Sequence, residues 1–517
     1  MINIKAFIKI LVVAILIIGM LAGCGEKPSP SPSPNSTPSL PEEGTVKLQD
    51  NAIYKIVSAL SGRVIQTQNF SKTNGSNLEQ DGYRGDTNQL WRAVLQSDGS
   101  YCFVSIGMEQ RYMTLKKGEK DNNTLICVNI PNENDDSQKW KVYEVNETYN
   151  RIVSVKTGKP IEVQKANKSV GAKIVQNDFS DESNSQYWRI EKVDDGEREL
   201  PQMFPITGAV EHSSCPEVVK CGDLYYMYIM SPGIAIKTSK DLRNWETLGK
   251  VFPVKGSKLP FDWMEERVPG GGIWAPGVYK IGDIYYLYYC VSTSGSQNSF
   301  IAVATNTTLD HTSPDFKWVD KGIVISSELG DPYNCIDPNV FIDDNGQAWL
   351  LFGSYWSGIQ VRKLNNATGK LAADDTTIHN IAGRPGTTTR AIEAPYMIKR
   401  GDYYYLFAAM GNLNEDYHCE VARSESMFGP FLDRKNRPML FTGNDANQAG
   451  GTRVSESKPG LNAPGHASIF LDDDGKYYFI TEYLEKGFPS QLAISTIVWD
   501  EEGWPQTALT PGLFPVE

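Results

Sequence analysis

Three residues with acid–base or metal-binding side chains stand in similar local contexts. Asp337 and Glu393 each lie within two residues of a proline, and His466 follows a glycine, each time at the start of an apolar run. Two carboxyl groups in one pocket can divide acid–base work, because one donates a proton while the other orients its partner. Such chemistry requires a fold that brings together residues far apart in the sequence.

A repeat of about 60 residues supplies that fold in residues 203–517. A tight-turn motif followed by an aromatic run occurs five times, and the successive turn glycines are 60, 64, 55 and 74 residues apart. A further β-type run follows each motif. Five such units predict a five-bladed β-propeller. The turn glycines are Gly222, Gly282, Gly346, Gly401 and Gly475.

The first strands of all blades line the axis of a propeller, so their starts should converge on one funnel. The funnel should contain Asp337, Glu393 and His466, with Trp274 in its wall. Two carboxyl groups in an aromatic-walled pocket suit hydrolysis of a glycosidic bond.

Several motifs in this region resemble glycoside hydrolase family 43, and most closely its endo-1,5-α-L-arabinanase branch. The resemblance runs through all five blades. The motifs are Ser239-Lys240-Asp241-Leu242-Arg243-Asn244-Trp245, Trp274-Ala275-Pro276, Ile336-Asp337-Pro338-Asn339-Val340-Phe341, Phe352-Gly353-Ser354-Tyr355-Trp356-Ser357-Gly358-Ile359, Ile392-Glu393-Ala394-Pro395-Tyr396 and Pro464-Gly465-His466.

This resemblance implies an inverting glycosidase acting on plant cell-wall polysaccharide or oligosaccharide, arabinan first, with xylan or galactan as alternatives. Carried over by motif, Glu393 is the expected general acid and Asp337 the carboxylate that orients it and tunes its pKa. Trp274 and Trp356 are expected to contact the sugar. His466 resembles a residue near a metal ion, so calcium or another metal is expected there.

The sequence departs from the family where the general base should be. Counting back from Gly222 places Cys215 at the family's base aspartate. A thiol with an ordinary pKa near 8.5 is a poor substitute, because an inverting reaction needs an ionised group to deprotonate water. Gly277 stands where the family often has a second aspartate.

Three explanations remain open. Glu217 lies two residues beyond Cys215, faces the same way in a strand, and could replace the base. Glu415 or Asp416, in the blade-four loop, could do so instead. Alternatively, hydrolysis is weak or absent and the chain is a carbohydrate-binding pseudoenzyme.

Residues 45–196 contain a different repeat. Gln-x-Trp motifs recur at intervals of 49 and 48 residues, each in a unit that opens with a short strand, and a threefold repeat of this kind predicts a closed barrel. The segment resembles the ricin-B-type lectin fold, a β-trefoil that commonly binds sugars. We expect the Gln-x-Trp residues to be core. The motifs begin at Gln89, Gln138 and Gln186.

The resemblance also suggests which repeat binds carbohydrate. The position that is often acidic in this family is Gln66 in repeat one, Thr114 in repeat two and Glu162 in repeat three. Only repeat three retains an acid, with Asn177 and Phe179 downstream. We therefore expect a sugar site at Glu162 and Asn177.

The N-terminal segment has the pattern of a targeting signal. Residues 1–23 resemble a bacterial lipoprotein signal that ends before Cys24, and residues 24–44 form a Pro/Ser-rich linker. We expect an extracytoplasmic protein anchored to the cell membrane by a lipid on Cys24.

Composition excludes other classes. The 517 residues are 40% apolar and carry a net charge of −12, which argues against disorder and against nucleic-acid binding. Seven further cysteines without CxxC spacing argue against a disulfide framework and a zinc site. The expected class is all-β, a β-trefoil followed by a five-bladed β-propeller.

Overall fold

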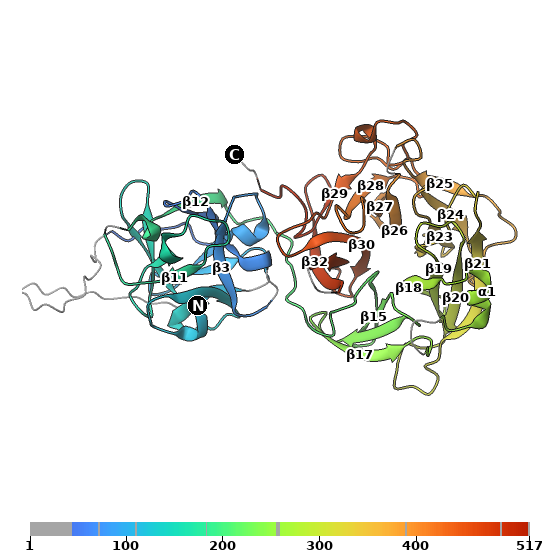
Figure 1. Cartoon of the computed structure of the whole chain (residues 1–517), viewed down its shortest axis with the longest axis horizontal. Helices are drawn as coiled ribbons and strands as arrows, with labels where there is room; N and C mark the ends of the chain where they lie inside the picture. Colours follow the sequence, from blue (N-terminus) through green and yellow to red (C-terminus); the bar gives the residue numbers. More distant parts are fainter. Residues whose placement is uncertain are drawn as a thin grey trace, which may run out of the picture. The chain divides into compact units, whose positions relative to one another are not determined.

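The computed structural model describes residues 44–514 except for 71–72, 109–110, 182, 255–258, 388–389 and 486–488. The predicted signal peptide, Cys24 and all of the predicted linker except Gly44 therefore lie outside the described residues. The described chain folds into the two predicted β-domains, with strands β1–β12 in one and β13–β33 in the other (Figure 1). Within the described residues no helix has the length and apolar character needed to cross a membrane.

The N-terminal domain is a β-trefoil, as predicted, and its three repeats have the same order of elements. Each repeat contains strand, strand, 3-10 turn, strand, 3-10 turn and strand, and the twelve strands join one sheet system. The elements are β1 (Ile53–Ser58), β2 (Val64–Thr67), η1 (Gln68–Phe70), β3 (Ser76–Asp81), η2 (Thr87–Gln89), β4 (Trp91–Leu95); β5 (Tyr101–Ser105), β6 (Tyr112–Leu115), η3 (Lys116–Gly118), β7 (Thr124–Asn129), η4 (Asp136–Gln138), β8 (Trp140–Glu144); and β9 (Asn150–Ser154), β10 (Ile161–Val163), η5 (Gln164–Ala166), β11 (Ile174–Gln176), η6 (Asn184–Gln186), β12 (Trp188–Asp194).

The Gln-x-Trp residues are core, as expected. Trp91, Trp140 and Trp188 are fully buried in one apolar cluster. Each indole N–H donates to a backbone carbonyl 3.0–3.2 Å away, and each glutamine amide donates to the backbone of the loop before it. The motif thus satisfies buried polar groups while filling the barrel, which explains its recurrence.

The C-terminal domain is the predicted five-bladed propeller, because its strands form five antiparallel sheets in chain order. In blade one the short β13 adds to the outer edge by parallel pairing with β17. The strands are β13 (Thr207–Gly208), β14 (Glu217–Cys221), β15 (Leu224–Ile229), β16 (Ala235–Ser239), β17 (Asn244–Lys250); β18 (Gly272–Ile281), β19 (Ile284–Ser292), β20 (Ser299–Asn306), β21 (Val319–Ser327); β22 (Asn339–Ile342), β23 (Ala348–Phe352), β24 (Ile359–Lys363), β25 (His379–Ala382); β26 (Ile392–Arg400), β27 (Tyr403–Met410), β28 (His418–Ser424), β29 (Thr452–Arg453); and β30 (Asn462–Leu471), β31 (Tyr477–Leu484), β32 (Gln491–Trp499), β33 (Pro505–Gln506). The short helix α1 (Asp262–Arg267) precedes β18, and the 3-10 turn η7 (Ala446–Gln448) precedes β29.

Local sequence explains each blade. All five turn glycines have positive φ, which lets the chain reverse between the first and second strands. The second strands are rich in aromatic and branched residues and are largely buried, as in β19 with its run Tyr285–Val291. Their side chains pack against those of the neighbouring blade, so apolar clusters between blades hold the ring together.

Candidate active site

The starts of the inner strands converge on a funnel, as the repeat predicts. One cavity of about 740 Å³ is lined by residues from all five blades, among them Trp274, Asp337, Trp356, Glu393 and His466. A residue with positive φ occurs at the equivalent point of every blade. Strained backbone of this kind persists where the surrounding structure holds it, often at functional sites. These residues are Cys215, Ala275, Asp337, Ala394 and His466.

Both carboxyl oxygens of Glu393 are held by hydroxyl groups. Ser354 Oγ donates to Oε2 at 2.7 Å, and Tyr417 OH donates to Oε1 at 2.7 Å. Tyr417 is fully buried and comes from the segment before β28. The two contacts fix the orientation of the carboxyl group within the funnel. Tyr417 carried no signal in the sequence, because its partner lies on another strand.

Asp337 lies beside this carboxyl group. Its Oδ2 accepts the backbone N–H of Ala394 at 3.1 Å, which ties blade three to blade four next to Glu393. Burial raises the pKa of Asp337 well above its usual range, and the nearby charge of Glu393 raises it further. The two carboxyl groups therefore interact strongly, as a proton donor and its modulator would.

The position expected for the general base holds a buried thiol. Burial raises the pKa of Cys215 well above its ordinary value, with further contributions from Glu482 and Asp337. The thiol is therefore neutral at pH 7 in the ion-free protein, and a neutral thiol cannot serve as a base.

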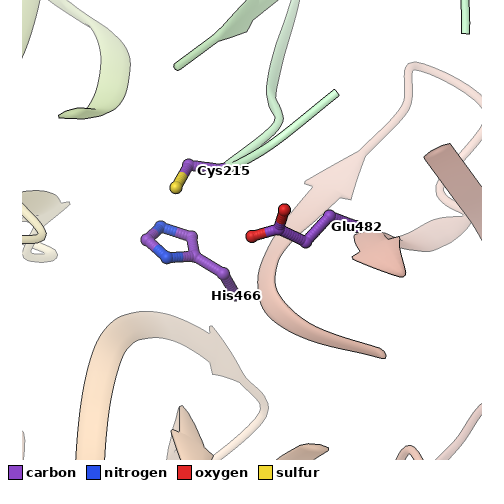
Figure 2. Close-up of side chains that lie close together, drawn as sticks. All are labelled: Cys215, His466 and Glu482. Atoms are coloured by element: carbon purple, nitrogen blue, oxygen red, sulfur yellow. The ribbon is translucent and has the colours of Figure 1, made fainter. Parts of the chain in front are cut away.

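Sequence reasoning missed Glu482, on β31, which lies next to Cys215 and His466 (Figure 2). One ligand atom from each of the three side chains falls within 4.8 Å of the others. Burial raises the pKa of Glu482 to about 7 and lowers that of His466 to about 4. No local pattern marked Glu482, because the pairing of β31 with β30 places it opposite Gly465, next to His466.

The predicted substitutes for the base lie elsewhere. Glu217 lines a much smaller cavity of about 20 Å³ on the axis, and its Oε1 accepts a hydrogen bond from Tyr396 OH at 3.4 Å. Burial raises the pKa of Glu217 well above its usual range. Glu415 and Asp416 do not appear among the described residues that line the funnel, and both bond to Asn412 within their own turn.

Gly277 has a packing reason for lacking a side chain. A Cβ at this position would lie 2.7 Å from Tyr279 OH and 3.0 Å from the carbonyl oxygen of Pro338. The second departure from the family pattern therefore coincides with a site where the neighbours leave no space for an aspartate.

In repeat three of the trefoil, the structure brings Glu162 and Asn177 together. Asn177 Nδ2 donates to Glu162 Oε1 at 2.5 Å, and Gln186 Nε2 donates to Oε2 at 2.9 Å. The expected downstream ring, Phe179, instead stacks on the Arg151 guanidinium, 4.2 Å from the ring centre. Two amides thus orient Glu162, whereas Phe179 is paired with a cation.

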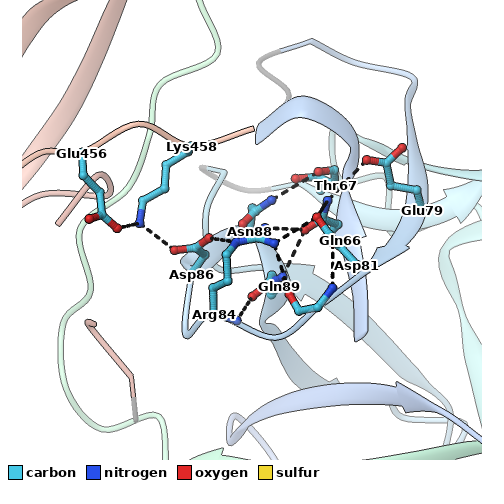
Figure 3. A network of polar contacts seen from close by, with 11 residues as sticks. Gln66, Thr67, Glu79, Asp81, Arg84, Asp86, Asn88, Gln89, Glu456 and Lys458 are labelled. Carbon is cyan, nitrogen blue, oxygen red and sulfur yellow. Dashed lines mark hydrogen bonds and ion pairs between the residues drawn. The ribbon is translucent and has the colours of Figure 1, made fainter. Parts of the chain in front are cut away.

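Repeat one is arranged differently (Figure 3). Arg84 donates to Gln66, Asp81 and Asp86, so its guanidinium occupies the position beside the residue that replaces the acid. Asp86 also pairs with Lys458 of the propeller at 2.7 Å. Repeat one is therefore filled by its own polar network and contacts the second domain.

Comparisons with known proteins agree with this architecture. Residues 210–505 match the glycosyl hydrolases family 43, and residues 45–129 and 136–202 match the ricin-type beta-trefoil lectin domain-like family. The first match includes every funnel residue named above.

Individual relatives each match a little more than half of this chain. An extracellular exo-alpha-(1->5)-L-arabinofuranosidase of Cellvibrio japonicus (strain Ueda107) is 37% identical over 56% of this chain and 85% of its own. An extracellular endo-alpha-(1->5)-L-arabinanase of Bacillus subtilis (strain 168) is 32% identical over 56% and 86%. The solved Cellvibrio cellulosa alpha-L-arabinanase, complexed with arabinohexaose, is 34% identical with a TM-score of 0.51, over 57% of this chain and 95% of that one.

Proposed function

The chain belongs to the glycosyl hydrolases of family 43, and on that premise we propose that its funnel hydrolyses arabinan with inversion. The observation that carries the proposal is the pair Asp337 and Glu393 in a cavity walled by Trp274 and Trp356. The relatives support the choice of substrate, because one is named as an exo-acting and another as an endo-acting enzyme on α-1,5-linked arabinose.

The residues would share the work as follows. Glu393, oriented by Ser354 and Tyr417, protonates the leaving oxygen. Asp337 holds the backbone N–H of Ala394, next to Glu393, and its buried carboxyl group interacts electrostatically with that of the acid. The tryptophans provide apolar faces for the sugar rings.

A binding protein without catalysis is the competing function, favoured by the neutral thiol of Cys215. A panel of arabinan, xylan and galactan separates the two. We expect the native chain to release sugars from arabinan, and Glu393→Gln to lose at least about 100-fold in rate, because general acid catalysis contributes that much. Glu415→Gln, an equivalent change in a turn outside the funnel lining, is the matched control and should retain the rate.

Two outcomes would contradict hydrolysis of arabinan. If the native protein releases nothing from any of the three polymers and Cys215→Asp gains activity, the chain is a pseudoenzyme. Release from xylan or galactan alone would keep hydrolysis and replace the substrate.

We further propose that repeat three of the trefoil holds the enzyme on its polymer through Glu162 and Asn177, and that a lipid on Cys24 anchors it to the membrane from outside. Retention of the chain in an arabinan gel tests the first point. Glu162→Gln should weaken retention, whereas Thr114→Val, at the equivalent position of repeat two, should not. Incorporation of labelled fatty acid that is lost in Cys24→Ala tests the second.

A further inference from the structure

Three side chains at the floor of the funnel point toward a common centre (Figure 2). Cys215 Sγ, a ring nitrogen of His466 and a carboxylate oxygen of Glu482 all lie within 4.8 Å of one another. They come from the chain before β14, from β30 and from β31, and all three line the funnel. A thiol, an imidazole and a carboxyl group are the three common zinc ligands in proteins.

The donor set does not suit calcium. Calcium takes six to eight oxygen ligands, and only Glu482 among the three offers a side-chain oxygen. Soft thiolate and imidazole ligands instead select zinc.

We therefore propose that Cys215, His466 and Glu482 bind one zinc ion, with its fourth position open to the funnel. Three protein ligands and one free position are the pattern of catalytic zinc sites, whereas structural sites have four protein ligands. The absence of CxxC spacing predicted no zinc site, because many zinc sites use closely spaced cysteines. Here a single cysteine is joined by two ligands that only the closure of the ring, blade five against blade one, brings to it.

Charge also favours an ion at this place. Zinc binds a neutral imidazole, a thiolate and a carboxylate, and its two positive charges would balance those of the thiolate and the carboxylate. Asp337 and Glu393 add two further carboxyl groups to the same cavity, in which Arg390 is the sole Lys or Arg among the described lining residues.

The role of the ion rests on the proposed hydrolysis. A zinc ion held by these three residues would lower the pKa of a bound water to about 7, and so supply a nucleophile where Cys215 stands in place of the expected base aspartate. The oxygen of the water bonds to the anomeric carbon as the bond to the leaving oxygen breaks. Glu393 gives its proton to the leaving oxygen. The proton lost by the water passes to solvent, and solvent then reprotonates Glu393.

Metal analysis of the untagged full chain tests the site without any activity assay. After chelation and dialysis against Zn²⁺ with excess Ca²⁺, the native chain should hold one zinc per molecule. Replacement by Co²⁺ should give a thiolate-to-cobalt charge-transfer band, and X-ray absorption of the zinc form should show one sulfur at about 2.3 Å. Cys215→Ser and Glu482→Gln should each weaken zinc binding at least tenfold, and Cys215→Ser should abolish the band.

Cys127→Ser, which removes a buried thiol from the trefoil, is the matched control and should keep both zinc and band. The proposal is overturned by a native chain without stoichiometric zinc, by bound zinc without a sulfur neighbour, or by an unchanged band in Cys215→Ser. If Cys215→Ser does not fold, the native cobalt spectrum and the sulfur distance decide alone. Zinc bound without sugar release would refute the hydrolysis, and sugar release by a zinc-free chain would refute the catalytic role of the ion.

Discussion

At the scale of single residues, the two sides of the funnel differ in how they are prepared. On one side Glu393 has both oxygens hydrogen-bonded and Asp337 beside it, so the geometry of a proton donor is fixed before substrate arrives. On the other side Cys215 is a neutral thiol that cannot act as a base alone, but it lies close enough to His466 and Glu482 to share a metal ion with them. Catalysis would therefore depend on the acid side through orientation and on the opposite side through an ion.

Tyr417 is the orienting residue with the clearest expected effect. In Tyr417→Phe the Glu393 carboxyl loses one of its two hydroxyl partners, and we expect kcat to fall roughly tenfold with little change in KM. Tyr405→Phe is the matched control, because it also removes a buried hydroxyl from blade four, one that donates to Gly503 O at 2.6 Å. Steady-state kinetics on arabinan check this, and equal kcat values for the two variants would contradict the role.

Local sequence was enough to predict Asp337 and Glu393, because both stand in recognisable strand-start motifs. It was not enough for Tyr417 and Glu482, since their roles arise from contacts across strands that no local pattern encodes. Cys215 lies between these cases. Its position was predicted from the repeat, but the neighbours that raise its pKa were visible only in the folded ring.

At the scale of elements, strand β30 controls both sides of the funnel. Its pairing with β31 has irregularities on either side of Gly465, and such bulges redirect the side chains beside them. His466 follows at once with positive φ. The repeat predicted the strand and its turn, whereas a bulge adds one residue to a strand without changing its apolar pattern and so escaped prediction.

Gly465 gives this element a direct test. A Cβ there would lie 2.0 Å from Cδ1 of the Tyr417 ring, so Gly465→Ala must displace the ring that orients Glu393. We expect a loss of about 1–3 kcal/mol in the free energy of unfolding, the usual cost of overpacking. Gly249→Ala in β17 is the control, because nothing lies within 4 Å of its Cβ position. Urea unfolding of both variants measures the difference, and a Gly465→Ala chain as stable as the native one would refute the packing argument.

At the scale of the whole molecule, the three trefoil repeats have diverged in use. Repeat three keeps an oriented acid, whereas repeat one fills its equivalent position with Arg84 and extends the network to the propeller through Asp86 (Figure 3). The chain end adds a second contact, because Leu513 and Phe514 pack in one apolar cluster with Ile53 of the trefoil. The repeats predicted each domain separately, but contacts between domains follow no period and could not be predicted.

The pair Asp86–Lys458 carries the last prediction. Both side chains are almost fully buried, 2% and 4% exposed. Removing one leaves the other buried with a single remaining ion-pair partner, Arg84 for Asp86 or Glu456 for Lys458. A double-mutant cycle with Asp86→Asn and Lys458→Met, followed by urea unfolding, should give a coupling free energy of about 2 kcal/mol or more. The same cycle at Asp474–Lys476, whose side chains are 48% and 60% exposed, should give a much smaller coupling free energy, because water screens that pair. Equal coupling in the two cycles would mean that the buried pair does not join the domains energetically.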